Sequence, residues 1–207
     1  VLGRSGRRFG DLRVGGHRAR RLNSLSIDEG LILLEDFGDK RVAPLLAADP
    51  APEREIYETA IDILAALHDH APPPIAPYHR GELLREVNIL TEWYLPIVGA
   101  GGDLSGYEAA WEAVWGNVIA ETEARPVLVL RDYHADNLMV LDDRDGLQRL
   151  GLLDFQDALA GHPAYDLVSF LQDARRDVDP RLETAMLDRY MAARGIADRA
   201  AFRASYE

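Results

Sequence analysis

The segment VLVLRDYHADNLMVL, residues 127–141, constrains the fold more than any other part of this sequence. Two runs of apolar, strand-forming residues, 127–130 and 138–141, enclose a turn that is rich in polar residues. Apolar runs of this length, bounded by turn residues, are typical of short buried strands. Asp132 and Asn137 lie in the turn, close enough for both side chains to face one cleft. The segment therefore predicts two buried strands that hold a polar, chemically active loop.

Apolar periodicity along the rest of the chain predicts a small β region followed by a larger helical part. A turn signal at 28–30 precedes residues 31–37, which read as a buried strand closed by Gly38. Residues 147–155, LQRLGLLDF, predict a further short strand. Helical spacing of apolar residues predicts helices over 52–70, 81–98, 107–123, 164–174, 180–193 and from 198 onward.

The composition excludes several classes of protein. Of the 207 residues, 47% are hydrophobic and 28% charged, which suits one large domain or two small ones with a sizeable core. The sequence has no cysteine, which excludes disulfides and thiolate metal sites but does not indicate a compartment. It has no signal-peptide pattern and no apolar stretch of membrane-helix length, so we expect a cytoplasmic protein that binds no membrane. A formal charge of −12 argues against a nucleic-acid partner and suits a cationic small molecule, a Mg²⁺ site or solubility alone. Nothing in the sequence indicates an oligomeric state.

A second carboxylate, Asp154 in GLLDFQDA, ends another apolar run 22 residues after Asp132. Two carboxylates and an amide at strand ends suit phosphoryl transfer from a nucleotide. That reaction needs a base for the attacking hydroxyl and hard oxygen ligands for Mg²⁺. The D-x-x-x-x-N spacing alone is a weak signal. YHADN also permits an H-x-D metallohydrolase site, but the sequence has only six histidines and no cluster that supports one.

Several segments together resemble the aminoglycoside phosphotransferase and choline kinase family. LRDYHADN is similar to its catalytic loop and LLDFQDA to its metal-binding strand, with Leu130 and Gln156 where protein kinases have histidine and glycine. A helix end of this family resembles ILAALHDH, and a helix start resembles GHPAYDLVSF. The last N-lobe strand and the hinge resemble LILLEDFGD. The resemblance runs from about Leu25 to residue 192. It is nearest to the bacterial cell-wall recycling kinases that phosphorylate the anomeric hydroxyl of N-acetylmuramate and N-acetylglucosamine.

The resemblance implies an α+β, protein-kinase-like, two-lobed fold with a small, incomplete, β-rich N-lobe and a larger, mainly helical C-lobe. Residues 1–38 would form the N-lobe remnant and hinge strand, and residues 39–207 the C-lobe with the catalytic loop and acceptor site. The implied cofactors are ATP and Mg²⁺, and the implied acceptor is a small molecule, an amino sugar. An aminoglycoside or choline-type kinase is the alternative within the same enzyme class.

The resemblance also assigns roles to individual residues. Asp132 would be the catalytic base, and Asn137 and Asp154 would bind Mg²⁺. Asp166 would hold the catalytic loop or face the dipole of its own helix, and His134 would have a structural role. Adenine would contact the backbone of the hinge residues Glu35, Asp36, Phe37 and Gly38. The candidate substrate residues are Glu82, Glu86, Trp93 and Arg175. For any single glutamate or aromatic residue on this helix, a solvated acidic face or a core aromatic is the preferred interpretation, and Arg175 also suits a surface ion pair.

The sequence departs from the family pattern on the phosphate side. Its single lysine, Lys40, follows the hinge, whereas such kinases carry a phosphate-binding lysine on an N-lobe strand. Either that segment lies outside this sequence, or an arginine substitutes, or the protein is a nucleotide-binding pseudokinase or interaction module. GRSGRRFG, with Arg7 and Arg8, could cover phosphates, although a flexible tail is the preferred interpretation. His68 and His70 are interpreted as helix-terminal partners of the dipole rather than a metal pair.

Overall fold

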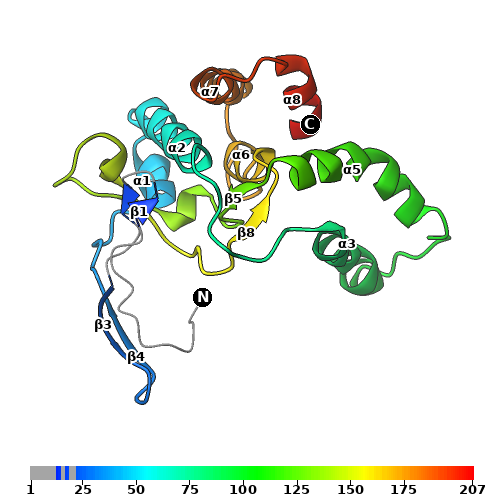
Figure 1. Ribbon diagram of the computed structural model, residues 1–207, viewed down its shortest axis with the longest axis horizontal. Coiled ribbons are helices and arrows are strands. Elements are labelled where there is room, and N and C mark those ends of the chain that lie inside the picture. Colours follow the sequence, from blue (N-terminus) through cyan, green and yellow to red (C-terminus); the bar gives the residue numbers. More distant parts are fainter. Residues whose placement is uncertain (1–12, 15–16, 19–21) are drawn as a thin grey trace.

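The structure, a computed structural model, describes residues 13–14, 17–18 and 22–207 of the chain (Figure 1). The GRSGRRFG segment, to which the sequence assigns a phosphate cover or a tail, lies outside the described residues. The strands are β1 (Arg13–Val14), β2 (His17–Arg18), β3 (Leu22–Ser26), β4 (Leu31–Leu34), β5 (Val127–Val129), β6 (Leu138–Val140), β7 (Leu150–Leu152) and β8 (Leu159–Gly161). The helices are α1 (Val42–Ala48), α2 (Glu53–His68), α3 (Arg80–Ile89), α4 (Leu95–Ile97), α5 (Tyr107–Ala124), α6 (Ala164–Leu171), α7 (Pro180–Ala193) and α8 (Arg199–Tyr206).

The predicted α+β class is confirmed, with helices forming far more of the described chain than strands do. The helix predicted over 81–98 is interrupted, because α3 passes into a π-helical turn over Leu90–Tyr94 before α4. Pro96, in α4, has no N–H group with which to continue the α-helical hydrogen bonding of α3. The short helix α1 and the strand β8 were not among the predicted elements.

The main core lies between the helices α2, α6 and α7 and the strands β5 to β7. Apolar residues at helical spacing on α2, from Ile56 to Leu67, are buried, and α2 packs along α7. Phe170 of α6 stacks on Tyr57 of α2, with ring centroids 4.4 Å apart. Burying a side chain of this kind stabilises the fold by about 1.5–3 kcal/mol, so these contacts hold the strand ends in fixed positions.

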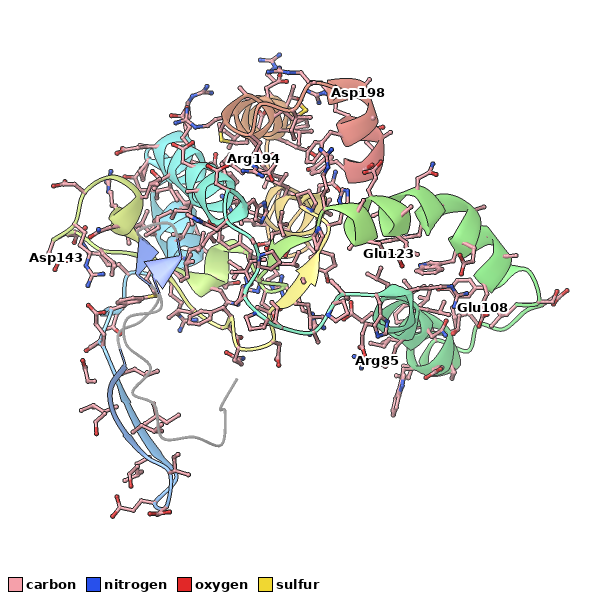
Figure 2. All side chains as sticks on the ribbon, in the orientation of Figure 1. Arg85, Glu108, Glu123, Asp143, Arg194 and Asp198 are labelled. Atoms are coloured by element: carbon pink, nitrogen blue, oxygen red, sulfur yellow. The ribbon has the colours of Figure 1, made fainter. Side chains whose placement is uncertain are left out.

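Charged side chains gather on the outer faces of the helices (Figure 2). Glu108 and Glu123 lie on α5, Arg85 on α3 and Arg194 at the end of α7. The helix α2, whose buried apolar residues recur at helical spacing, is amphipathic, as the periodicity predicts. In the described part of the chain, no helix combines the length and apolar character that crossing a membrane requires.

The strand predicted as buried over 31–37 is shorter and largely exposed, so this prediction is wrong. The strand β4 ends at Leu34, and Leu31 is 62% exposed. The turn signal is confirmed, because Gly30 adopts φ +65° and its N–H donates to the Ile27 carbonyl over 3.2 Å. The hairpin of β3 and β4 projects from the helical body (Figure 1), so its apolar side chains lie away from the described core.

His68 is buried in the core, and its hydrogen bonds give no support to its interpretation as a helix-terminal partner of the dipole. Its Nδ1 lies 2.7 Å from the Tyr190 hydroxyl and its Nε2 3.1 Å from the Leu128 carbonyl. Burial lowers the pKa of His68 to about 3, because the charged imidazolium would lose its hydration. His68 therefore joins α2, α7 and β5 by hydrogen bonds.

Candidate active site

The loop between β5 and β6 carries Asp132 and Asn137, and it is fixed by a buried carboxylate. Asp166, in the first turn of α6, accepts the Leu130 N–H over 2.7 Å and the Arg131 N–H over 3.0 Å. Burial raises the pKa of Asp166 to about 7, while the two N–H donors act to lower it. The geometry supports the first of its two predicted roles, which is to hold the catalytic loop.

Asn137 lies between the loop and the strand that leads to Asp154. Its Nδ2 donates to the Asp132 carbonyl over 3.0 Å and lies 3.2 Å from Nε2 of the buried His134. Its own carbonyl accepts the Leu153 N–H over 2.9 Å. The pairing of β6 with β7 continues through this bond and brings Asp154 next to Asn137. Because both amide hydrogens point to the loop, Oδ1 of Asn137 is the atom left for a cation.

Backbone strain gathers on both sides of this arrangement. Arg131, just before Asp132, has φ +72°, and Asp154 has φ +55°. A positive φ in a residue other than glycine costs about 1–3 kcal/mol, and such residues cluster at functional sites. Asp132 is half-buried, whereas Asp154 is exposed and its Oδ1 accepts a hydrogen bond from Nε2 of Gln156.

The oxygen donors of this site fit Mg²⁺ rather than a metal that needs a full cage of protein ligands. Among the residues that the structure describes, no group of three or more histidine, cysteine, aspartate or glutamate side chains could hold a metal ion. Mg²⁺ is usually bound by one or two protein oxygens together with water and substrate phosphates. Asn137 Oδ1 and a free carboxylate oxygen of Asp154 match that pattern, and the predicted H-x-D metallohydrolase alternative gains no support from the described histidines.

The predicted hinge, Glu35 to Gly38, is attached to the strand that leaves the catalytic loop. Phe37 is buried against Met139 and Leu141, and the Val140 N–H donates to the Lys40 carbonyl over 2.8 Å. Glu35 forms an ion pair with Arg144, while Asp36 Oδ1 accepts the Gly38 N–H over 2.8 Å. Gly38 has φ +70°, a conformation that favours glycine and lets the chain turn from the hairpin into α1.

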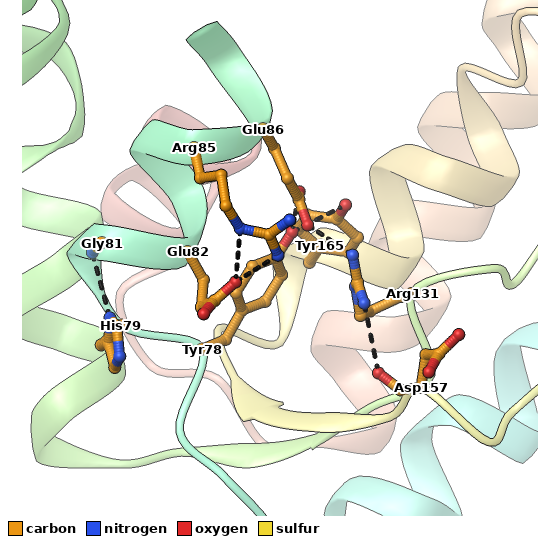
Figure 3. Close-up of polar contacts among 9 residues, drawn as sticks. All are labelled: Tyr78, His79, Gly81, Glu82, Arg85, Glu86, Arg131, Asp157 and Tyr165. Atoms are coloured by element: carbon orange, nitrogen blue, oxygen red, sulfur yellow. Dashed lines mark hydrogen bonds and ion pairs between the residues drawn. The ribbon is translucent and has the colours of Figure 1, made fainter. Parts of the chain in front are cut away.

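The predicted substrate residues are spread over several elements. Glu82 of α3 is paired with the exposed Arg85, and Trp93, on the π-helical turn, is 67% exposed. Arg175 follows α6 and donates to Asp173 Oδ1 over 3.2 Å. Glu86 is the member of this group that reaches the catalytic loop, where it pairs with Arg131 (Figure 3).

Sequence reasoning missed three residues that surround this part of the loop. Arg131 contacts Glu86, and the rings of Tyr78 and Tyr165 lie beside them, with centroids 5.0 Å apart. Arg131 could have been considered, because it directly precedes the predicted base. Tyr78 and Tyr165 carry no comparable signal, since each is a single aromatic residue in a connector or at a helix start.

Comparison with known proteins identifies relatives over most of the chain. A sequence model of the phosphotransferase enzyme family matches residues 18–204. The N-acetylmuramate/N-acetylglucosamine kinase of Caulobacter vibrioides is 44% identical over 190 residues, covering 86% of this chain and 51% of that protein. The chain therefore spans about half the length of the curated relatives it matches.

Solved structures share the fold at low sequence identity. Choline kinase LicA of Streptococcus pneumoniae matches with a TM-score of 0.56 at 14% identity, covering 87% of this chain and 57% of that one. An aminoglycoside phosphotransferase of Streptomyces rimosus, in complex with ADP and streptomycin, matches with a TM-score of 0.55 at 18% identity and covers 91% and 74%. The predicted kinase-like fold is confirmed by these neighbours.

Proposed function

This chain belongs to the phosphotransferase enzyme family, and we propose that it is part of an ATP- and Mg²⁺-dependent kinase for a sugar hydroxyl. The proposed acceptor is the anomeric hydroxyl of N-acetylmuramate or N-acetylglucosamine, the two sugars in the name of the Caulobacter relative. The observation that carries the proposal is the loop in which Asp132 is held beside Asn137 and, through β7, Asp154.

Asp132 is the proposed base. Its carboxylate accepts the proton of the attacking sugar hydroxyl while the oxygen of that hydroxyl forms a bond to the γ-phosphorus of ATP. The bond from that phosphorus to the bridging oxygen breaks, and ADP leaves. Asp166 keeps the loop in place through the Leu130 and Arg131 N–H groups, so Asp132 does not have to be ordered when the acceptor arrives.

Asn137 and Asp154 are the proposed holders of Mg²⁺, which when bound would neutralise phosphate charge and align the phosphates for attack. Asn137 offers its Oδ1 atom. Asp154, which follows the strand β7, offers a carboxylate oxygen. The hinge Glu35, Asp36, Phe37 and Gly38 is proposed to offer backbone groups to adenine. The segment that follows it lies against the loop-bearing strand β6, through a bridge between Arg41 and Met139.

The substrate residues stay predictions. Glu82 and Trp93, on α3 and the turn that follows it, are accessible for hydrogen bonding and stacking with a sugar. Arg175 would suit an anionic group such as the lactyl carboxylate of N-acetylmuramate. We further propose that residues 39–207 are the C-lobe and that the enzyme acts in the cytoplasm, in cell-wall recycling.

The second candidate is a kinase for an aminoglycoside or choline. It is favoured by the formal charge of −12, which suits a cationic acceptor, and by the choline kinase and the streptomycin complex among the solved structures. It differs from the first candidate in the acceptor and not in the roles of Asp132, Asn137 and Asp154.

An acceptor panel separates these candidates. ADP release by the full-length protein with ATP and Mg²⁺ is measured with N-acetylmuramate, N-acetylglucosamine, choline and kanamycin. We expect turnover with the two sugars and little above background with the other two. Turnover with choline or kanamycin alone would support the second candidate, whereas nucleotide binding without turnover of any acceptor would support a pseudokinase.

A further inference from the structure

Arg131, which directly precedes the proposed base, is held by its side chain as well as by its backbone. Its guanidinium forms an ion pair with Glu86 of α3, and only about a quarter of each side chain is exposed, 26% for Arg131 and 25% for Glu86 (Figure 3). The same side chain donates to the Asp157 carbonyl over 3.5 Å. Three separate parts of the chain therefore meet at the residue before Asp132.

Two tyrosines complete this contact. The Tyr78 hydroxyl donates to Oε2 of Glu86 and lies 3.1 Å from the Tyr165 hydroxyl. The Arg131 guanidinium carbon lies 5.6 Å from the centroid of the Tyr78 ring, within the range of a cation–π interaction. Both carboxylate oxygens of Glu86 are thus engaged, one by Arg131 and the other by Tyr78. A partly buried, charge-assisted pair of this kind constrains geometry more than an exposed surface pair does.

The conformation of Arg131 needs such support. Its φ of +72° is unfavourable for a residue with a Cβ atom and persists where neighbouring contacts outweigh its cost. Asp166 of α6 fixes the Arg131 N–H over 3.0 Å, and Glu86 of α3 fixes the guanidinium. The backbone and the side chain of one strained residue are therefore anchored to different helices.

We propose that Glu86 and Arg131 form a positioning pair that sets Asp132 relative to α3, and that Glu86 acts through Arg131 and not as a ligand of the acceptor. The inference rests on the proposed function, because Asp132 is the proposed base and α3 carries the proposed acceptor residues Glu82 and, in the turn that follows, Trp93. Arg131 ties these two parts together, so the distance from base to acceptor depends on the pair.

The kinetic test uses Glu86→Gln, Arg131→Met and the double variant in the full-length protein, with N-acetylmuramate and N-acetylglucosamine as acceptors. Because a small displacement of a catalytic group lowers turnover strongly, we expect each single variant to lower kcat about 10- to 100-fold with little change in the acceptor KM. The double variant should be no worse than the more impaired single variant, since both remove one interaction. A raised acceptor KM with unchanged kcat in Glu86→Gln would overturn the proposal, as it would identify Glu86 as an acceptor ligand.

Glu112→Gln is the matched control, because Glu112 of α5 forms an ion pair with Arg80 of α3 away from the loop. It removes the same charge from the same pair of chemical groups and should leave kcat unchanged. A fall in kcat equal to that of Glu86→Gln would contradict a specific role for the Arg131 pair.

Hydrogen–deuterium exchange distinguishes a failure of this inference from a failure of the proposed function, because it needs no acceptor. The amides of Leu130, Arg131 and His134 are hydrogen-bonded in the loop and should exchange faster in Glu86→Gln and Arg131→Met, while those of α2 and α7 stay unchanged. Unchanged loop exchange overturns the inference even if the wild-type protein is an active kinase. Faster loop exchange upholds it even if no tested acceptor is turned over.

Discussion

At the scale of single residues, Asp166 links stability to pH. Its folded-state pKa of about 7 lies above the value of about 4 expected in the unfolded chain. Between these values the folded state binds more protons than the unfolded state does. The contribution of Asp166 to stability is therefore fully present below about pH 4 and is lost as the pH rises through about 7.

Asp166→Asn removes this titration. We expect the free energy of unfolding of the wild-type protein to fall more steeply between about pH 5 and pH 8 than that of the variant, because only the wild-type side chain must release a proton. Urea denaturation at a series of pH values measures both slopes. Parallel slopes would show that Asp166 does not titrate in this range.

Asp154 supplies the carboxylate of the proposed Mg²⁺ site. Asp154→Ala should weaken Mg²⁺ binding in the presence of ADP by about tenfold or more, since a carboxylate ligand is lost. Calorimetric titration of Mg²⁺ into the ADP-bound protein gives the affinity. Asp143→Ala, which removes a carboxylate that is 83% exposed from the turn after β6, should leave it unchanged. Equal affinities in wild type and Asp154→Ala would remove Asp154 from the site.

At the scale of elements, the hinge depends on a close approach between β7 and Phe37. A Cβ atom on Gly151 would lie 2.5 Å from the Phe37 ring, which is buried against Met139 and Leu141. Gly151→Ala should therefore destabilise the protein by about 1–3 kcal/mol through overpacking. Gly116→Ala, in the open interior of α5, should instead be neutral or stabilising by up to about 1 kcal/mol. Thermal unfolding compares the two variants, and a Gly151→Ala protein as stable as wild type would contradict this packing.

Individual helices and the polar loop were predictable from the sequence, whereas the parts of the chain that pack against a given residue were not. Apolar periodicity identified α2 and α7, and the polar turn between two apolar runs identified the loop that carries Asp132. The same reasoning failed for Leu31, because an apolar run does not reveal whether another layer covers it. It also could not reveal the burial of His68 or its hydrogen bond with Tyr190, a residue far along the chain.

The groups proposed to react were named from the sequence and stay predictions, whereas the contacts that support them could not be predicted. The resemblance placed Asp132, Asn137 and Asp154, and the structure brings their backbones together through Asn137. The pairing of Glu86 with Arg131 was not predictable, since it joins a helix to a loop with no local sequence signal. Whether Glu86 contacts the substrate or the loop can be asked only after the fold is known.

At the scale of the whole molecule, the loop that carries Asp132 lies where two groups of helices meet. The strands β5 and β8 separate the core around α2 and α7 from the pair α3 and α5 (Figure 1). A smaller apolar cluster, which includes Tyr78, Leu83 and Trp111, attaches α3 and α5 to these strands. The proposed base thus lies between the main core and α3, the helix proposed to carry acceptor residues.

The proposed role of Asp132 is tested most directly by ADP release from the full-length protein and its Asp132→Ala variant, with ATP, Mg²⁺ and N-acetylmuramate or N-acetylglucosamine. We expect wild-type turnover that requires the sugar and a variant rate lower by about 10²- to 10⁴-fold, the usual contribution of a general base. The variant should bind ADP as tightly as the wild type, since Asn137 and Asp154 are unchanged. Retention of wild-type turnover by Asp132→Ala would show that Asp132 is not the base.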